Sequence, residues 1–246
     1  MSLESTIADL VTKTTNLLDY FNNKKAGIDS AVAAAIAAVP ANLKVFYVNQ
    51  LTGVDTNVGS TSAPLKTLDR ALYNTPVGGV CRVYLQDDYT MSSNINVDGR
   101  FLTIFSDVTG TRRKLIPVYY LAAEGTANYL SGFPIMNGGQ IMMQDIVIPI
   151  PSSAGLAIAP TGFTCSMFKT TSNGGTPIVA VKMTQCEVTA PADFPGALLG
   201  VPNSAVVFEV LAVSFPVGFN GRYLFGVSAG TASNTLPNVL TNLSTL

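Results

Sequence analysis

The first forty residues carry a series of side chains spaced at alternating steps of four and three, which is the heptad spacing of a coiled coil. A coiled-coil seam is completed by partner helices, so this pattern favours self-association, with an amphipathic helix packed on its own domain as the alternative. Pro40 ends the pattern, and we predict an N-terminal helical stem over residues 1–44 that forms a homotrimer and attaches the chain. The seam comprises Leu3, Ile7, Leu10, Thr14, Leu17 and Phe21, and continues less cleanly through Lys24, Ile28, Ala31, Ala35 and Ala38.

The pattern changes after Pro40 to short β-branched and aromatic runs separated by Gly, Asn, Asp and Pro. Runs of this kind predict strands and turns, and no convincing helical segment interrupts them after Val80. We therefore predict a mainly β body over residues 45–246. The expected strands are residues 45–48, 81–85, 94–97, 101–105, 114–120, 139–148, 177–188, 205–213 and 221–227.

Two arrangements of these strands remain open. Runs such as residues 102–105, 146–150 and 205–213 are almost continuously apolar, which suits strands covered on both faces. A short parallel β-helix would cover them in this way, and its turns accept insertions of any length. A sandwich of two antiparallel sheets is the alternative.

A weak internal sequence repeat, called the internal echo below, relates residues 141–148 to residues 181–188. Such an echo is expected when neighbouring coils of a solenoid repeat their inward positions, although the spacing along the chain is irregular. The matched positions are Met143 with Met183, Asp145 with Gln185, Ile146 with Cys186 and Ile148 with Val188.

The segment from Val45 to Leu72 reads as a strand, a polar loop and a short helix. The loop residues Gly53, Asp55, Asn57 and Gly59 are turn formers. A calcium site at Asp55 and Asn57 is the more specific alternative, although the loop lacks the Glu ligand that usually ends a calcium-binding loop. The helix, expected over residues 64–73, is amphipathic and would cap the open end of a stacked β structure. Its apolar face comprises Leu65, Leu68, Ala71 and Leu72.

The residues "FYVNQLTGVDTNVGSTSAPLKTLDRAL" (46–72) resemble the entry segment of the pectate-lyase-like, right-handed parallel β-helix domains of bacteriophage tail fibre and tailspike proteins. Residues 75–106 continue in the style of the first coils, and residues 26–44 resemble the linkers that precede such domains. The resemblance implies a capping region over 45–75 and coils over 76–190. Residues 191–246 would form a C-terminal β module, because the resemblance fades beyond Ser106.

Composition excludes several classes of function. The net charge is −1 and the 14 basic residues form no cluster, which argues against nucleic-acid binding. The apolar run of residues 31–39 is too short to span a bilayer as a helix, and no secretory leader is visible, so we expect synthesis in a bacterial cytoplasm. The absence of histidine and the wide separation of three cysteines argue against a metal or cofactor. Charged residues are only 12%, which favours buried interfaces.

The acidic residues suggest no clear catalytic site. Glycoside hydrolysis needs two carboxylates facing each other across the bond, and Asp87, Asp88 and Asp98 all read as turn residues. Asp145 and Glu187 could approach each other on neighbouring coils. We therefore expect no enzymatic activity, with a small polysaccharide depolymerase as the alternative.

These observations favour a structural and adhesive role in a virion, as part of a phage tail fibre or short spike. The expected partners are further copies of the chain, other tail or baseplate proteins and a host cell-surface polysaccharide. An adaptor or decoration protein that links virion proteins is another alternative. Aromatic and amide side chains suit sugars or subunit interfaces, and the candidate receptor contacts are Tyr119, Tyr120, Asn128 and Tyr129.

Overall fold

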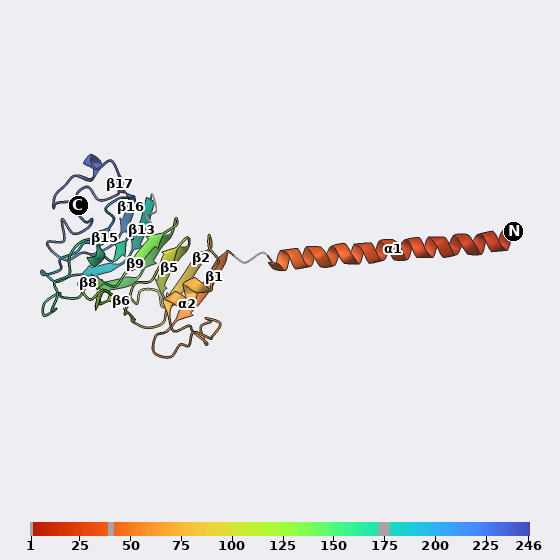
Figure 1. Ribbon diagram of the computed structural model, residues 1–246, viewed down its shortest axis with the longest axis horizontal. Helices are drawn as coiled ribbons and strands as arrows, with labels where there is room; N and C mark the ends of the chain where they lie inside the picture. Colours follow the sequence, from red (N-terminus) through yellow and green to blue (C-terminus); the bar gives the residue numbers. More distant parts are fainter. Residues whose placement is uncertain (1, 39–41, 172–177) are drawn as a thin grey trace. The chain divides into compact units, whose positions relative to one another are not determined.

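The computed structural model describes residues 2–38, 42–171 and 178–246, and the chain divides into two units, Met1–Ala41 and Asn42–Leu246 (Figure 1). The first unit is one helix, α1 (Leu3–Ala38), of 36 residues. The helix continues through Gly27, where its seam weakens in sequence. Among the described residues, no helix is both long enough and apolar enough to cross a membrane.

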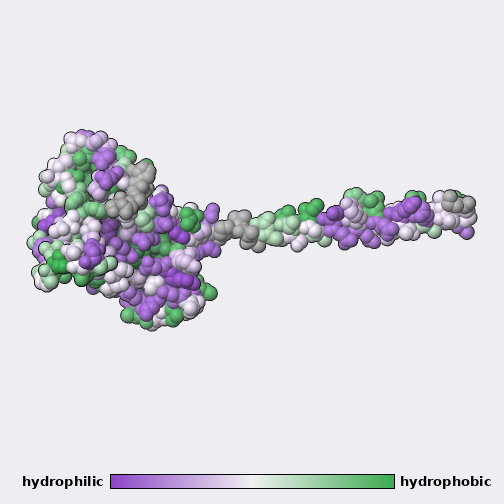
Figure 2. Space-filling model, viewed as in Figure 1, coloured by the Kyte–Doolittle hydropathy of each residue, from purple (hydrophilic) through white to green (hydrophobic). Residues whose placement is uncertain are grey.

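Helix α1 exposes the apolar side chains of its seam. Leu3, Leu10 and Phe21 are 77%, 65% and 59% exposed. The Thr14 hydroxyl is used within the helix, because its Oγ1 donates a hydrogen bond to the Leu10 carbonyl at 2.8 Å. Figure 2 shows hydrophobic and hydrophilic residues interspersed along the visible side of this helix. Taken by itself, the helix therefore does not cover its own apolar seam.

The second unit consists mainly of strands in parallel sheets. The neighbours of the seven-stranded sheet are parallel throughout, and most lie side by side across Figure 1. Its order is β1 (Leu43–Val48), β2 (Val80–Leu85), β5 (Phe101–Ser106), β10 (Gln140–Gln144), β13 (Ile178–Thr184), β16 (Ala205–Leu211) and β17 (Val239–Thr241).

Two four-stranded parallel sheets and one hairpin complete the body. The hairpin, β7 (Tyr119–Leu121) with β8 (Asn128–Leu130), is antiparallel. One four-stranded sheet has the order β14 (Glu187–Thr189), β11 (Ile146–Pro149), β6 (Arg113–Pro117) and β3 (Tyr89–Met91), and the other has the order β15 (Leu199–Gly200), β12 (Phe168–Lys169), β9 (Phe133–Met136) and β4 (Val97–Asp98). Short 3-10 turns are η1 (Phe163–Cys165) and η2 (Ser233–Thr235).

The chain visits the three parallel sheets in the same order several times. It runs β2, β3, β4, then β5, β6, β9, then β10, β11, β12, then β13, β14, β15, with the β7–β8 hairpin inserted between β6 and β9. Among the described strands, every pairing outside that hairpin is parallel. The antiparallel sandwich considered from sequence is therefore wrong.

Single residues with a left-handed backbone conformation divide segments that the sequence pattern predicts as continuous strands. Asp145, Gln185 and Ala212 have φ values of 56°, 54° and 53°. They follow Gln144, Thr184 and Leu211, which pair with one another across the seven-stranded sheet, so the bends are stacked. The expected strands 139–148 and 177–188 are each split at this bend, because the left-handed backbone turns the chain into the next sheet. The internal echo is confirmed, with Met143 opposite Met183 and Ile148 opposite Val188.

Inward-facing apolar side chains from the sheets form one core. The seven-stranded sheet alternates buried and more exposed positions, as expected where one face packs on the core. Each fully buried aliphatic or aromatic side chain contributes about 1.5–3 kcal/mol relative to exposure. The largest fully buried side chains include Phe133, Phe168, Phe208, Leu85, Leu102, Ile104, Leu115, Leu130 and Ile135.

Three other expectations need correction. Residues 221–227 form no strand, because this stretch makes turns in which Tyr223 and Leu224 are buried and Leu224 makes only an isolated bridge to Leu199. The expected strand 94–97 is reduced to β4, which begins at Val97. The body begins earlier than expected, since β1 starts at Leu43.

The capping helix is shorter than its sequence pattern predicts. Helix α2 (Leu68–Tyr73) has Thr67 as its N-cap, whose hydroxyl accepts a hydrogen bond from the Arg70 N–H. The helix buries one face, which consists of Leu68, Ala71 and Leu72. Leu65 is buried as well but lies outside the helix, in an isolated bridge to Val48. The assignment of Leu65 to the helix face is therefore wrong.

The loop carboxylate of Asp55 binds the start of this helix. Its Oδ1 accepts hydrogen bonds from the N–H groups of Lys66 (3.0 Å) and Thr67 (2.9 Å), and its Oδ2 accepts one from the Thr67 hydroxyl (2.9 Å). Asn57 donates to the Pro64 carbonyl at 2.9 Å. Asp55 and Asn57 therefore connect the loop to the helix, and the residues described contain no cluster of three or more acidic or cysteine side chains that could hold a metal.

Replacing Asp55 with Ala is expected to lower the free energy of unfolding of the body by about 2 kcal/mol, because three hydrogen bonds to a carboxylate are lost. Chemical denaturation of the wild type and the variant measures this difference. Thr56→Ala, at an exposed position of the same loop, is the matched control and should change stability by less than ~0.5 kcal/mol. Equal effects of the two substitutions would contradict the role assigned to Asp55.

Candidate functional site

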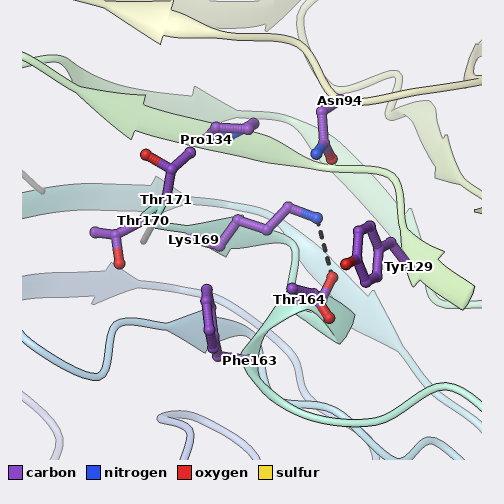
Figure 3. Close-up of a pocket in the computed structure, with 8 residues that line it drawn as sticks. All are labelled: Asn94, Tyr129, Pro134, Phe163, Thr164, Lys169, Thr170 and Thr171. Atoms are coloured by element: carbon purple, nitrogen blue, oxygen red, sulfur yellow. Dashed lines mark hydrogen bonds between the residues drawn. The ribbon is translucent and has the colours of Figure 1, made fainter. Parts of the chain in front are cut away.

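A cavity of about 210 Å³ lies beside the β4–β9–β12 sheet (Figure 3). Its walls come from segments far apart in sequence: the loop before β4, strands β8, β9 and β12, the η1 turn, and the residues that follow β12. Parallel pairing of β12 with β9, with Phe168 opposite Phe133, brings these segments together. The lining residues are Asn94, Tyr129, Pro134, Phe163, Thr164, Lys169, Thr170 and Thr171.

Lys169 is the cationic group of this cavity. The residue is only 3% exposed, and its Nζ donates hydrogen bonds to the carbonyl oxygens of Leu130 and Thr164, the latter at 3.1 Å. Within the described residues, none of the ion pairs involves Lys169. Burial lowers the pKa of this amine to about 7, with a smaller opposing effect of Cys165.

Other polar side chains also line the cavity. Figure 3 shows Asn94 and Tyr129 on the side toward which the Lys169 side chain extends. The Asn94 side chain forms a hydrogen bond with Tyr120, but its buried Oδ1 has no partner among the described residues. Tyr129 donates its hydroxyl proton to Glu124 at 3.0 Å, and Thr164 donates to the Thr161 carbonyl at 3.1 Å. The cavity thus combines a cation, an amide acceptor, hydroxyls and two aromatic rings.

The four candidate receptor residues are placed by the β7–β8 hairpin, and only Tyr129 lines the cavity. Tyr120 lies opposite Tyr129, with ring centroids 6.1 Å apart in an edge-to-face arrangement. The Tyr119 hydroxyl is buried and without a partner in the described part of the chain, and burial raises its pKa strongly. Asn128 needs correction as a surface contact, because it is 8% exposed and its amide donates to the Ile158 carbonyl at 2.6 Å.

Sequence reasoning missed Lys169 and Asn94. A signal for Lys169 was present, since it is a lone charged residue directly after the buried Met167 and Phe168. A lysine in such a position requires either a partner or a cavity. Asn94 had no signal of its own, because its role depends on which strands stack beside it.

The acidic residues considered for catalysis are engaged elsewhere. Glu187 forms an ion pair with Arg112 at 3.0 Å, and its strand neighbour is Val147 rather than Asp145. Asp145 occupies the stacked bend opposite Gln185. Asp88 accepts a hydrogen bond from the Lys114 N–H at 2.7 Å, and Asp98 accepts one from Asn137.

A second candidate surface is the outer face of the seven-stranded sheet. Tyr47, Tyr84 and Phe105 occupy equivalent positions of β1, β2 and β5, and their rings stack with centroids 5.2 Å and 5.5 Å apart. The Arg82 guanidinium lies 5.8 Å from the Phe105 ring centroid. On the opposite half of this face, the exposed apolar residues are Ile178, Val207, Leu211 and Leu240.

No family model matches the chain, and comparison with curated proteins and with solved structures gives no match.

The depressed pKa of Lys169 predicts a specific dependence of stability on pH. Between its folded pKa of about 7 and the ordinary value of 10.5, the unfolded chain binds a proton that the folded chain does not. Lys169 therefore makes stability rise with pH across this window, by up to about 1.4 kcal/mol per pH unit. The pKa values of Cys81 and Cys186, which burial raises from 9.0 to about 11, act in the opposite direction above pH 9.

The Lys169→Met variant isolates this contribution, because the cysteines are the same in both proteins. The free energy of unfolding, measured by denaturation at intervals from pH 7 to 9.5, should rise less with pH, or fall more, in the variant than in the wild type. Parallel pH profiles would show that the Lys169 amine keeps an ordinary pKa in the folded protein.

Proposed function

We propose that this protein is a structural and adhesive component of a bacteriophage tail, either a tail fibre or a short spike, that acts as a homotrimer in the virion. The observation that carries the proposal is the exposed apolar seam of helix α1. Its attachment partners would be other tail or baseplate proteins, and the body would contact a cell-surface polysaccharide or another fibre protein. The proposed role is not enzymatic.

The stem requires partners on energetic grounds. Isolated helices owe little stability to propensity alone, and helix α1, taken by itself, leaves large apolar side chains more than half exposed. Transfer of each into a helical bundle is favourable by about 1.5–3 kcal/mol. The exposed set includes Ile7, Leu10, Val11, Leu17, Leu18, Phe21, Ile28, Val32 and Ile36.

The width of the apolar stripe supports more than two helices. With Leu10 and Leu17 at d positions of the heptad, Val11, Leu18 and Val32 take e positions and widen the seam beyond the a/d pair. A two-stranded coil would leave these e residues in water. The a and d residues alone do not select three strands, since Ile at a with Leu at d favours two. The trimer is proposed on the heptad seam together with the low fraction of charged residues, 12% of the chain.

A right-handed parallel β-helix is the proposed architecture of the body. It is supported by the repeated passage of the chain through three parallel sheets in one order and by the stacked bends at Asp145, Gln185 and Ala212. In such a structure, each coil buries its apolar residues against the coils before and after it. Helix α2 would then cover one open end and prevent strand addition there. This construction suits a stiff appendage.

The stem hypothesis predicts that melting of helix α1 depends on protein concentration. The double substitution Leu10→Asp with Leu17→Asp places charges in the seam and should abolish the bundle, so its helical signal should be weak and independent of concentration. The wild-type helical transition, followed by circular dichroism at 222 nm, should fall by roughly 5–10 °C for each tenfold dilution.

Asn16→Asp is the matched control, because it adds a carboxylate to the same helix at a position outside the a, d and e seam. It should keep the wild-type concentration dependence. A wild-type transition that does not move on dilution would contradict self-association through the stem.

A further inference from the structure

The Lys169 ammonium has one donor for which the described residues supply no acceptor. A protonated lysine has three N–H groups, and here two of them donate to the carbonyl oxygens of Leu130 and Thr164. These oxygens carry only partial negative charge, and the described residues supply no carboxylate to neutralise the cation. A buried cation in this situation is best compensated by an anion that enters the cavity with its own charge.

The rest of the lining is chemically suited to a sugar ring. The unpartnered Asn94 Oδ1 can accept a hydrogen bond from a ligand hydroxyl, and Thr170 and Thr171 add hydroxyl groups. The Tyr129 and Phe163 rings offer apolar faces on which the C–H groups of a sugar can pack. The volume of about 210 Å³ is below the ~300–1,000 Å³ of drug-sized pockets, which limits the ligand to about one ring.

We propose that the cavity around Lys169 binds a single carboxylate-bearing sugar unit, such as a uronic acid residue of a polysaccharide, with the carboxylate on the Lys169 ammonium and the sugar hydroxyls on Asn94 and the threonines. This rests on the proposed adhesive function and names the class of receptor that the body recognises.

Binding of such a ligand is coupled to protonation of Lys169. An anion beside the amine favours the charged form, so the bound state raises the pKa and takes up a proton when binding occurs above pH 7. Affinity should therefore fall as pH rises from 7 to 9. Among the described residues, the other titratable groups near the amine are Cys165, the last residue of η1, and Tyr129 on β8, behind which Glu124 accepts the tyrosine hydroxyl proton.

The test uses the full chain and titrates D-glucuronate, D-glucose and acetate at pH 6.5, with binding followed by ligand-detected NMR. Glucuronate should bind at least about tenfold more tightly than either control, since glucose lacks the charge and acetate lacks the ring. Lys169→Met should reduce glucuronate binding to the level of glucose. Lys66→Met removes an exposed lysine of the capping loop and should leave binding unchanged.

Asn94→Asp provides a second variant at a partly exposed position, where loss of folding is less of a concern. Its added carboxylate should repel the glucuronate carboxylate and weaken glucuronate binding relative to the wild type. Equal affinities for glucuronate and glucose, or binding that survives Lys169→Met, would overturn the proposal. Equal affinities for glucuronate and acetate would reduce the site to a general anion site and overturn the assignment to a sugar.

These outcomes are separate from those that test the trimeric fibre. A soluble monosaccharide enters one cavity within one body, so its binding does not require the stem. A trimer that fails to bind glucuronate would refute the receptor class alone, whereas a monomer that binds it would refute the fibre and keep the site.

Discussion

In-register hydrogen bonding between parallel strands is the constraint on which the rest of the body depends. Because side chains alternate between the two faces of a strand, a shift of one residue would exchange the buried and exposed sets. The long register of β13 with β16, from Ile178 opposite Ala205 to Thr184 opposite Leu211, keeps Val181 and Phe208 on the core face. The stacked bends and the assembly of the Lys169 cavity both follow from this register.

The cavity illustrates how such stacking creates a site without a sequence motif. Lys169 comes from β12, Tyr129 from the inserted hairpin and Asn94 from a loop that precedes β4. They come together only because β12, β9 and β4 pair in one sheet. Burial of Lys169 disfavours its charged form, and the two carbonyl oxygens compensate for this only in part. A folded protein tolerates this cost most readily where the group has a function, which is why the cavity, rather than the scattered acids, is the candidate site.

Several features could be predicted from sequence because their signals are local. The heptad spacing from Leu3 to Phe21 predicts the helix, and the echo of Met143 with Met183 predicts the pairing of two strands. Short strands such as β12 and β15, of two residues each, carry no periodicity and are defined only by their neighbours. The left-handed bend at Ala212 lacks the usual Gly or Asn signal, and Leu65 fits a helical pattern although it pairs with a strand. The roles of Lys169 and Asn128 depend on long-range packing that one sequence does not reveal.

The account depends most on the claim that the stem is incomplete in a single chain. Helix α1 does not cover its own apolar seam, and every functional proposal that involves a fibre requires this seam to be covered by further copies. The most direct measurement is the mass of the intact protein in solution by multi-angle light scattering. The account predicts three times the 25.8 kDa of one chain. A mass of one chain at all concentrations would contradict it, and a mass of two would keep self-association but refute the trimer.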